Sequence, residues 1–301
     1  MARLTRPADS APGSRSTATS DSSLTTVVRT REALRAALES STHPIGLVPT
    51  MGWLHEGHRA LMRRARAESA TTVVSIFVNP RQFGDPRDLA QYPRKEENDV
   101  SICRDDGVDL VFAPSVDDVY PPGFDTTVSV GAIALPLEGA ARPGHFEGVA
   151  TVVAILFGLV RAERAYFGQK DAQQIAVIRR MAIDLAIPTE VVPCPTVREP
   201  DGLAISSRNV HLSPEERAAA PVLHRALLAG RAAWEAGERS AEVLQARTRA
   251  ELSTEPLASL DYVSCADRTD LTELARVDGP ALLSLAVRFG STRLIDNEPL
   301  G

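Results

Sequence analysis

The sequence predicts an α/β protein with a larger N-terminal domain and a smaller α+β domain after it. From about residue 24 to residue 196, amphipathic helical segments alternate with short strands rich in β-branched residues. This alternation is typical of a parallel sheet covered by helices on both faces. After residue 212, two helical segments rich in Ala, Arg and Glu precede three strand-like segments, as in many α+β domains. We therefore expect a Rossmann-like parallel sheet in domain 24–196 and a smaller α+β lid domain over 197–301.

In the N-terminal domain, each helix is assigned from apolar residues at helical spacing and each strand from a short apolar run. The predicted helices are Thr30–Leu38, Gly57–Glu68, Asp88–Asp106, Gly148–Arg161 and Asp171–Leu185. The predicted strands are Ile45–Val48, Thr72–Val78, Leu110–Phe112, Thr127–Val130, Arg164–Phe167 and Glu190–Val192. The apolar run 148–160 is shorter than the roughly 20 residues that a membrane span needs, so we interpret it as a buried helix.

The two ends of the chain differ in character. The C-terminal domain is assigned helices Pro214–Gly237 and Ala241–Glu251 and strands Leu260–Cys265, Ala281–Val287 and Thr292–Ile295. Residues 1–23 are rich in Ser, Thr, Ala and Pro and lack apolar periodicity, so we expect a disordered tail. This tail has no apolar signal-peptide core, and Asp9 and Asp21 argue against a transit peptide.

The composition is that of an ordinary globular protein, with 44% hydrophobic and 24% charged residues. A formal net charge of −6 argues against a general nucleic-acid or anionic-membrane surface, because such binding rests on an excess of Lys and Arg. Cys103, Cys194 and Cys265 are far apart and form no C-x-x-C, which indicates neither a disulfide framework nor a metal site. We expect a cytoplasmic protein with no nucleic-acid or membrane partner.

The segment from Val48 to His58 passes from an apolar strand into a helix start. Pro49 and Gly52 mark the break, and His55 and His58 lie three residues apart, on one helical face if the first turn has formed. Backbone N–H groups at such a helix start attract phosphate oxygens. Imidazoles there can donate further hydrogen bonds and carry the charge that develops on a departing pyrophosphate. We expect a triphosphate here; two surface histidines are the alternative, and the absence of H-E-x-x-H disfavours zinc.

Two further segments place polar side chains directly after predicted strands. Asn79 and Gln82 follow one strand, and their amides can orient a small substrate with hydroxyl and carboxylate groups. A turn Asn and an exposed Gln are the alternative. Gly168, Lys170 and Asp171 follow another strand, where they provide close backbone approach, a charge for phosphate and a helix cap, respectively. Because ligands of parallel sheets bind beyond the carboxyl ends of the strands, we expect these segments to meet.

A fourth segment, 197–209, is rich in turn residues and holds two hydroxyls beside an arginine. Ser206, Ser207 and Arg208 suit a mobile anion clamp, because a guanidinium forks onto phosphate oxygens and each hydroxyl donates one bond. On its own, such a segment is more often a helix cap. The sequence contains no Walker A motif and no G-x-G-x-x-G after the first strand, so phosphate has to be held in another way.

Six motifs in order carry a resemblance to a known family. They are Pro49–His58, Phe77–Gly84, Tyr92–Arg94, Arg142–Phe146, Phe167–Asp171 and Val197–Asn209. Each motif is weak alone, but together they are specific, and over residues 25–297 the chain resembles the pantothenate synthetases, which are pantoate–β-alanine ligases of the nucleotidyltransferase superfamily. The first motif resembles the family's HIGH-type signature, and Ser206–Arg208 resembles its counterpart of the KMSKS loop.

The resemblance implies an AMP-forming ligase of coenzyme A biosynthesis. The carboxylate of pantoate attacks the α-phosphate of ATP and releases pyrophosphate, and the amine of β-alanine then displaces AMP from the pantoyl adenylate. The resemblance also implies Mg²⁺ as the counter-ion of the triphosphate, without a dedicated protein site, and a homodimer, the commonest symmetric assembly.

By resemblance, the family's functional residues map onto three sets in this chain. The catalytic residues are His55, His58, Lys170 and Arg208, with His58 as acid toward the leaving group. The ATP-binding residues are Pro49, Thr50, Met51, Gly52, His55, His58, Gly168, Gln169, Lys170, Asp171, Val197, Ile205, Ser206, Ser207 and Arg208. The residues for pantoate or β-alanine are Gln82, Gln174, Asn79, Met51 and Tyr92.

The chain departs from the family pattern at a few positions. Asn98 stands where an acid is common, so no carboxylate is assigned to Mg²⁺. Gln169 replaces the usual Glu, Ala172 an aromatic residue, Trp53 a small residue and Ile205 the usual Met. None of these changes removes a phosphate-binding charge, so we predict an active enzyme. The rival hypotheses are another nucleotidyltransferase, which would lack the paired glutamines, and a silent relative, which the intact histidines and cations oppose.

Overall fold

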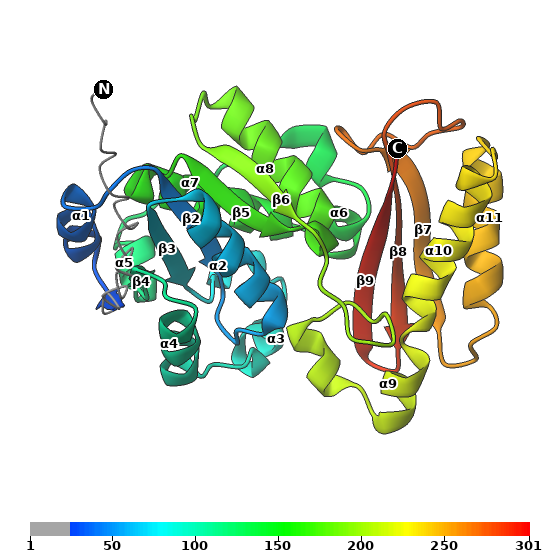
Figure 1. Ribbon diagram of the computed structural model, residues 1–301, viewed down its shortest axis with the longest axis horizontal. Helices are drawn as coiled ribbons and strands as arrows, with labels where there is room; N and C mark the ends of the chain where they lie inside the picture. The colour runs from blue at the N-terminus through cyan, green and yellow to red at the C-terminus, as the bar shows by residue number, and fades with distance from the viewer. Residues whose placement is uncertain (1–24) are drawn as a thin grey trace, which may run out of the picture.

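The computed structural model describes residues 25–301, which form two parts joined side by side (Figure 1). The N-terminal part contains a six-stranded parallel sheet in the order β1-β4-β3-β2-β5-β6. Its strands are β1 (Thr26–Val28), β2 (Ile45–Thr50), β3 (Thr71–Ile76), β4 (Leu110–Phe112), β5 (Arg164–Gly168) and β6 (Glu190–Cys194). The C-terminal part contains an antiparallel sheet of β7 (Ser259–Asp267), β8 (Ala281–Phe289) and β9 (Thr292–Leu300). The predicted fold class is therefore confirmed, while the tail predicted at 1–23 lies outside the described residues.

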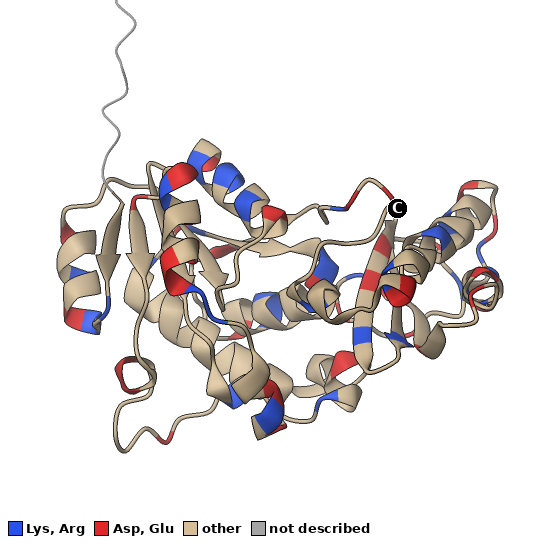
Figure 2. Ribbon diagram, turned by 90° about the horizontal axis from the view of Figure 1, so that it is seen from below, with Lys and Arg blue, Asp and Glu red and all other residues tan. Residues whose placement is uncertain are grey.

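Helices surround both sheets. The α-helices are α1 (Arg31–Glu39), α2 (Glu56–Glu68), α3 (Pro86–Gln91), α4 (Glu96–Asp105), α5 (Val116–Val119), α6 (Glu138–Ala141), α7 (His145–Val160), α8 (Ala172–Asp184), α9 (Pro214–Ala219), α10 (Val222–Glu235) and α11 (Ala241–Leu252). The 3₁₀ turns are η1 (Pro80–Gln82), η2 (Gly131–Ala134), η3 (Gln169–Asp171) and η4 (Ser207–His211). Within residues 25–301, no helix is both long and apolar enough to cross a membrane. Basic and acidic residues are interspersed over both parts in the view of Figure 2.

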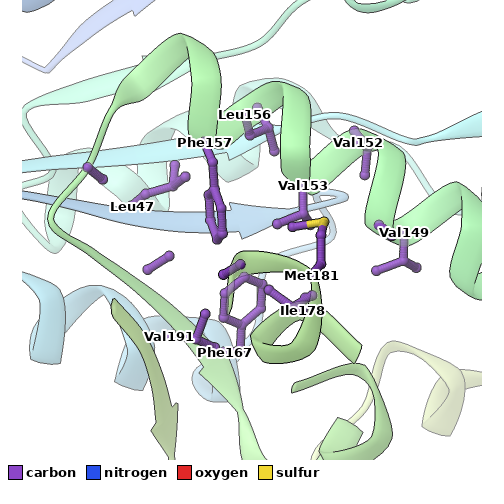
Figure 3. Close-up of a cluster of buried hydrophobic side chains, with 14 of the residues drawn as sticks. Leu47, Val149, Val152, Val153, Leu156, Phe157, Phe167, Ile178, Met181 and Val191 are labelled. Atoms are coloured by element: carbon purple, nitrogen blue, oxygen red, sulfur yellow. The ribbon is translucent and has the colours of Figure 1, made fainter. Parts of the chain in front are cut away.

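The parallel sheet is buried on both faces, because successive strand residues point to opposite sides. Val73 packs into a cluster with α1, α7 and α8, whereas Val74 packs into a cluster with α2 and α4. Figure 3 shows part of the first cluster, where Phe157 of α7 lies with Phe167 of β5 and Met181 of α8. Fully burying one such side chain stabilises the fold by about 2 kcal/mol. From Gly148 onward, helix α7 is apolar and mostly buried, as expected for the predicted buried helix.

The C-terminal part has a core of its own. Helices α10 and α11 contact each other and cover one face of the antiparallel sheet (Figure 1). Their apolar residues, such as Leu227 and Leu244, join sheet residues such as Leu283 in a separate buried cluster. The three cysteines all lie in the described part of the chain and are buried and unpaired. Burial raises the pKa of Cys103 in the N-terminal core to about 12 and that of Cys265 in the C-terminal core to about 11.

Several predicted elements are wrong in detail. Segment 127–130 is not a strand, since it pairs with no neighbour and Val128 N instead donates to Thr151 Oγ1 of α7. The helix predicted at 88–106 is two helices, because Pro93 forces the residue before it out of helical geometry. Pro221 likewise divides the helix predicted at 214–237 into α9 and α10, since it has no N–H to continue the ladder. Strand β1 was not predicted, because its three residues give no periodicity to detect.

Candidate active site

The loop between β2 and α2 is a tight turn held by a buried carboxylate. Gly52 and Trp53 have positive φ angles of 79° and 53°, and Thr50 Oγ1 accepts a hydrogen bond from Gly52 N at 3.2 Å. The Asp99 carboxylate of α4 accepts from Trp53 N at 2.9 Å and from Leu54 N at 2.8 Å. Asp99 is 1% exposed, and burial raises the pKa of its carboxyl. The turn that leads to the histidines therefore depends on a residue from another helix.

His55 and His58 stack against each other at the start of α2, with ring centroids 4.1 Å apart. His55 N donates a long hydrogen bond to His58 Nδ1 at 3.4 Å, which assigns the proton of the neutral His58 ring to Nε2. Burial, followed by the charge of Lys170, lowers the pKa of His55 to about 4. Burial, followed by His55, lowers the pKa of His58 to about 3. Both rings are therefore neutral near pH 7, and His55 Nδ1 is buried without a partner among residues 25–301.

The loop after β5 brings Lys170 and Asp171 to the same place. Lys170 Nζ lies 3.6 Å from Asp171 Oδ1, and the charges of both residues act on the two histidines. Burial acts to raise the pKa of Asp171, but Lys170 and Arg208 outweigh it and leave this pKa below its usual value. Asp171 occupies the N-cap position of α8, but its side chain makes no capping bond. The predicted cap is therefore right in position and wrong in chemistry, because the carboxylate faces the cations.

The segment 197–209 folds back on itself beside Tyr92. Ile205 N donates to Val197 O at 2.9 Å, and Ser206 Oγ accepts from Arg208 N at 3.3 Å as the cap of η4. The helix-cap alternative for this segment is therefore observed for Ser206, while Arg208 remains within electrostatic reach of Asp171. Burial raises the pKa of Tyr92, and the nearby Ser207 side chain acts to lower it. Tyr92, assigned to substrate, thus lies beside the segment assigned to ATP.

The amides predicted for substrate occupy two different environments. Asn79 Nδ2 donates to Gln82 Oε1 at 3.0 Å and to Gly148 O at 3.0 Å, and Asn79 Oδ1 accepts from Tyr120 Oη at 2.7 Å. Both groups of Asn79 are therefore occupied, and in this structure Asn79 orients Gln82. Gln174 instead lines a cavity of about 50 Å³ between the two parts of the chain.

Three cations line this interdomain cavity, namely Arg142, Lys170 and Arg208. Met51 and Gly52 line a second cavity of about 250 Å³, which is bounded by residues of the β3 end and α4. The charges of Lys170 and Asp171 act on both histidines, and the charge of Arg208 acts on Asp171, so these residues form one group. Met51 lines the second cavity instead. Gln82 does not line the interdomain cavity, but its carbonyl oxygen is contacted by His145 and Arg142, which do.

Three functional candidates, Arg142, His145 and Asp99, were not assigned a role from the sequence. His145 Nδ1 lies 2.9 Å from Gln82 O, and Arg142 Nη1 lies 3.2 Å from His145 Nε2. With Nδ1–H donating to that carbonyl, Nε2 accepts from Arg142, so Arg142 and His145 fix the backbone that carries Gln82. Arg142 and His145 belong to the motif 142–146, which contributed to the family resemblance, but no function was predicted for them from the sequence. Asp99 lies five residues after the 92–94 motif. Its structural role is seen only from its hydrogen bonds with Trp53 N and Leu54 N.

Comparisons with known proteins bear on this site. The family model described as pantoate-beta-alanine ligase matches residues 23–299. A relative named pantothenate synthetase, from Roseiflexus sp. (strain RS-1), is 60% identical over 274 residues, which cover 91% of this chain and 97% of the relative. The chain belongs to the pantoate–β-alanine ligase family. A crystal structure of pantothenate synthetase from Thermus thermophilus has a TM-score of 0.86 at 49% identity, covering 90% of this chain and 98% of that one.

A second ligase structure, from Francisella tularensis, is described as complexed with beta-gamma ATP and beta-alanine. It is 33% identical, has a TM-score of 0.75, and covers 91% of this chain and 97% of that chain. Residues 25–301 of this chain contain no group of three or more His, Cys, Asp or Glu side chains placed to hold a metal ion.

Proposed function

We propose that this chain is a ligase that uses ATP to condense pantoate with β-alanine through a pantoyl-adenylate intermediate. A pantoate carboxylate oxygen bonds to the α-phosphorus of ATP as the bond to pyrophosphate breaks. The β-alanine nitrogen then bonds to the pantoyl carbonyl carbon, the bond to AMP breaks, and the amine releases a proton. The observation that carries this proposal is the meeting of two half-buried neutral histidines with Lys170, Asp171 and Arg208 at the carboxyl edge of the sheet.

These side chains suit a reaction in which charge moves onto a departing pyrophosphate. Lys170 and Arg208 supply fixed positive charge for phosphate oxygens. The His58 ring is neutral near pH 7, so it acts first as an Nε2–H donor to the leaving group. The negative charge of bound triphosphate would raise the pKa of His58, so that the protonated ring could act as an acid. His55 donates beside it. Alignment and charge stabilisation account for most of the catalysis in such transfers.

The remaining binding roles follow the same arrangement. We assign the nucleotide to the β2–α2 turn, the loop after β5 and segment 197–208. We assign pantoate and β-alanine to Gln82, Gln174, Met51 and Tyr92, and Asn79 orients Gln82 through a hydrogen bond. Mg²⁺ accompanies the triphosphate, whose charge it offsets. We also propose a cytoplasmic homodimer; the unpaired buried thiols accord with a reducing compartment.

Measurement of the two half-reactions tests this function. Pyrophosphate release from ATP, Mg²⁺ and pantoate alone, followed by AMP release when β-alanine is added, is the expected result. Pyrophosphate release without AMP release that depends on β-alanine would instead indicate an adenylyltransferase with another second substrate. Nucleotide binding without either product would indicate a silent relative.

A further inference from the structure

Two adjacent polar residues, Asp296 and Asn297, are buried halfway along β9, an edge strand of the C-terminal sheet. They are 2% and 4% exposed, respectively. Polar groups buried this deeply need hydrogen-bonding partners, and successive strand residues point to opposite faces. Asp296 Oδ1 accepts one hydrogen bond from Asn297 N of the same strand at 2.9 Å. The other side-chain partners of both residues lie outside the C-terminal sheet, in the two loops that carry the cations of the site.

Asn297 forms hydrogen bonds with the loop that carries Lys170. Asn297 Nδ2 donates to Gln169 O and to Lys170 O, each at 2.9 Å. Asn297 Oδ1 accepts from Gln169 Nε2 at 3.2 Å. Three hydrogen bonds therefore hold η3 from the opposite domain, and they fix the backbone from which Lys170 extends toward the histidines.

Asp296 holds the other phosphate-facing segment. Its carboxylate, 1% exposed as a side chain, accepts two hydrogen bonds from Arg198, at 2.6 Å and 3.0 Å. Arg198 also donates to Gly202 O at 3.1 Å, and residue 198 pairs with Ala204 as an antiparallel bridge. This hairpin leads directly into Ser206, Ser207 and Arg208.

We infer that Asp296 and Asn297 form a positioning pair that sets the distance between Lys170 and the Ser206–Arg208 segment for the triphosphate. The inference rests on the proposed function, since the ligand to be positioned is ATP. Neither side chain needs to touch the nucleotide. The C-terminal sheet is then part of the nucleotide site, because one dipeptide of β9 fixes both of its cationic loops.

Gln169 gives this arrangement a specific chemistry. Its amide donates to Asn297 Oδ1, which an ionised carboxylate at residue 169 could not do. The Gln that departs from the usual family residue is therefore matched to the asparagine opposite. A Gln169→Glu chain would lose this bond and place a negative charge beside the phosphate site.

The test compares Asn297→Ala with Asn297→Asp, using Mg·ATP binding by calorimetry and the kinetics of pyrophosphate release. Loss of the bonds to the Lys170 loop is expected to weaken ATP binding at least about tenfold, while the KM for β-alanine stays unchanged. The Asp variant keeps the volume but presents oxygen to two carbonyls, so it should bind ATP more weakly than the Ala variant. A role in packing alone predicts the opposite order and would overturn the inference.

A double-substitution cycle shows whether Asn297 acts through Lys170. The effect of Asn297→Ala on ATP affinity should shrink to less than about twofold in a Lys170→Ala background, since coupled residues are not additive. An equal effect in both backgrounds would refute the inference. Glu298→Gln on the same strand breaks an ion pair with Arg231 inside the C-terminal part and serves as the matched control.

Two further variants keep the test decisive if Asn297→Ala fails to fold. Gln169→Ala removes the reciprocal bond from the N-terminal side, and Asp296→Asn keeps the side-chain volume but removes the charge that holds Arg198. Each should weaken ATP binding, and wild-type affinity in both would contradict the inference. If the unsubstituted chain ligates pantoate while these variants bind ATP normally, only the inference fails; if it shows no ligation, the proposed function fails.

Discussion

Replacing Asp99 with alanine would remove both acceptors of the turn that precedes the histidines. Trp53 N and Leu54 N would lose hydrogen bonds of 2.9 Å and 2.8 Å to a buried carboxylate. Hydrogen bonds to a charged group are each worth about 1.5–3 kcal/mol. Some of this gain is offset by the cost of burying the carboxylate, so we expect Asp99→Ala to lower the free energy of unfolding by about 2–4 kcal/mol.

The same substitution should slow pyrophosphate release by about a hundredfold, because displacement of catalytic groups by about 1 Å has effects of that order. Urea unfolding and the pantoate half-reaction measure the two effects separately. Asp99→Asn keeps one acceptor oxygen, so it should lower the free energy of unfolding by roughly half as much as Asp99→Ala does. The exposed neighbour Asn98 on the same helix offers the control Asn98→Ala. Wild-type unfolding and wild-type pyrophosphate release in Asp99→Ala would refute this account of the turn.

Other outcomes follow from the same geometry. Lys170→Ala and His58→Ala should each lower pyrophosphate release by about a hundredfold or more with the unfolding midpoint little changed; loss of activity through unfolding alone would remove their assigned roles. Trp53→Ala should keep or improve turnover. The Trp53 ring packs against Lys95, whose Nζ lies 5.1 Å from the ring centroid, and the Trp53 backbone has a positive φ angle. A large loss in steady-state rate would contradict this prediction. Because the pKa values of His55 and His58 fall from 6.5 to about 4 and about 3 on folding, the unfolded chain binds more protons below pH 6.5. The free energy of unfolding should therefore decrease as the pH falls from about 6.5 toward 4, and the decrease should be smaller in His55→Asn, as measured by urea titration at each pH.

The sequence predicted those parts of the site that follow a strand. Strands β2, β3 and β5 are strong apolar runs, and polar residues at their carboxyl ends are expected to meet whatever their separation in sequence. His58, Gln82 and Lys170 were identified on this basis together with the family resemblance. The roles of Asn79 and Asp171 were harder to assign, because the direction of a side chain depends on contacts such as the Tyr120 hydroxyl on Asn79.

The contribution of Asn297 could not be read from the sequence. Its partners Gln169 and Lys170 are 128 and 127 residues away in the other part of the chain, and a buried asparagine in a strand has no local signature. The same reason applies to β1, whose pairing with β4 is what defines it as a strand. Local patterns predict elements, whereas contacts between distant segments decide which groups complete the site.

The buried thiols give the chain an internal reporter of its own opening motions. Thiolate is the species that reacts with alkylating agents, so Cys103 and Cys265, both fully buried with raised pKa values, become reactive only when the packing around them opens. Cys103 lies in the N-terminal core and Cys265 in the C-terminal core. Alkylation followed by mass spectrometry under native conditions would therefore time the opening of each domain separately, with and without ATP, and without any introduced label.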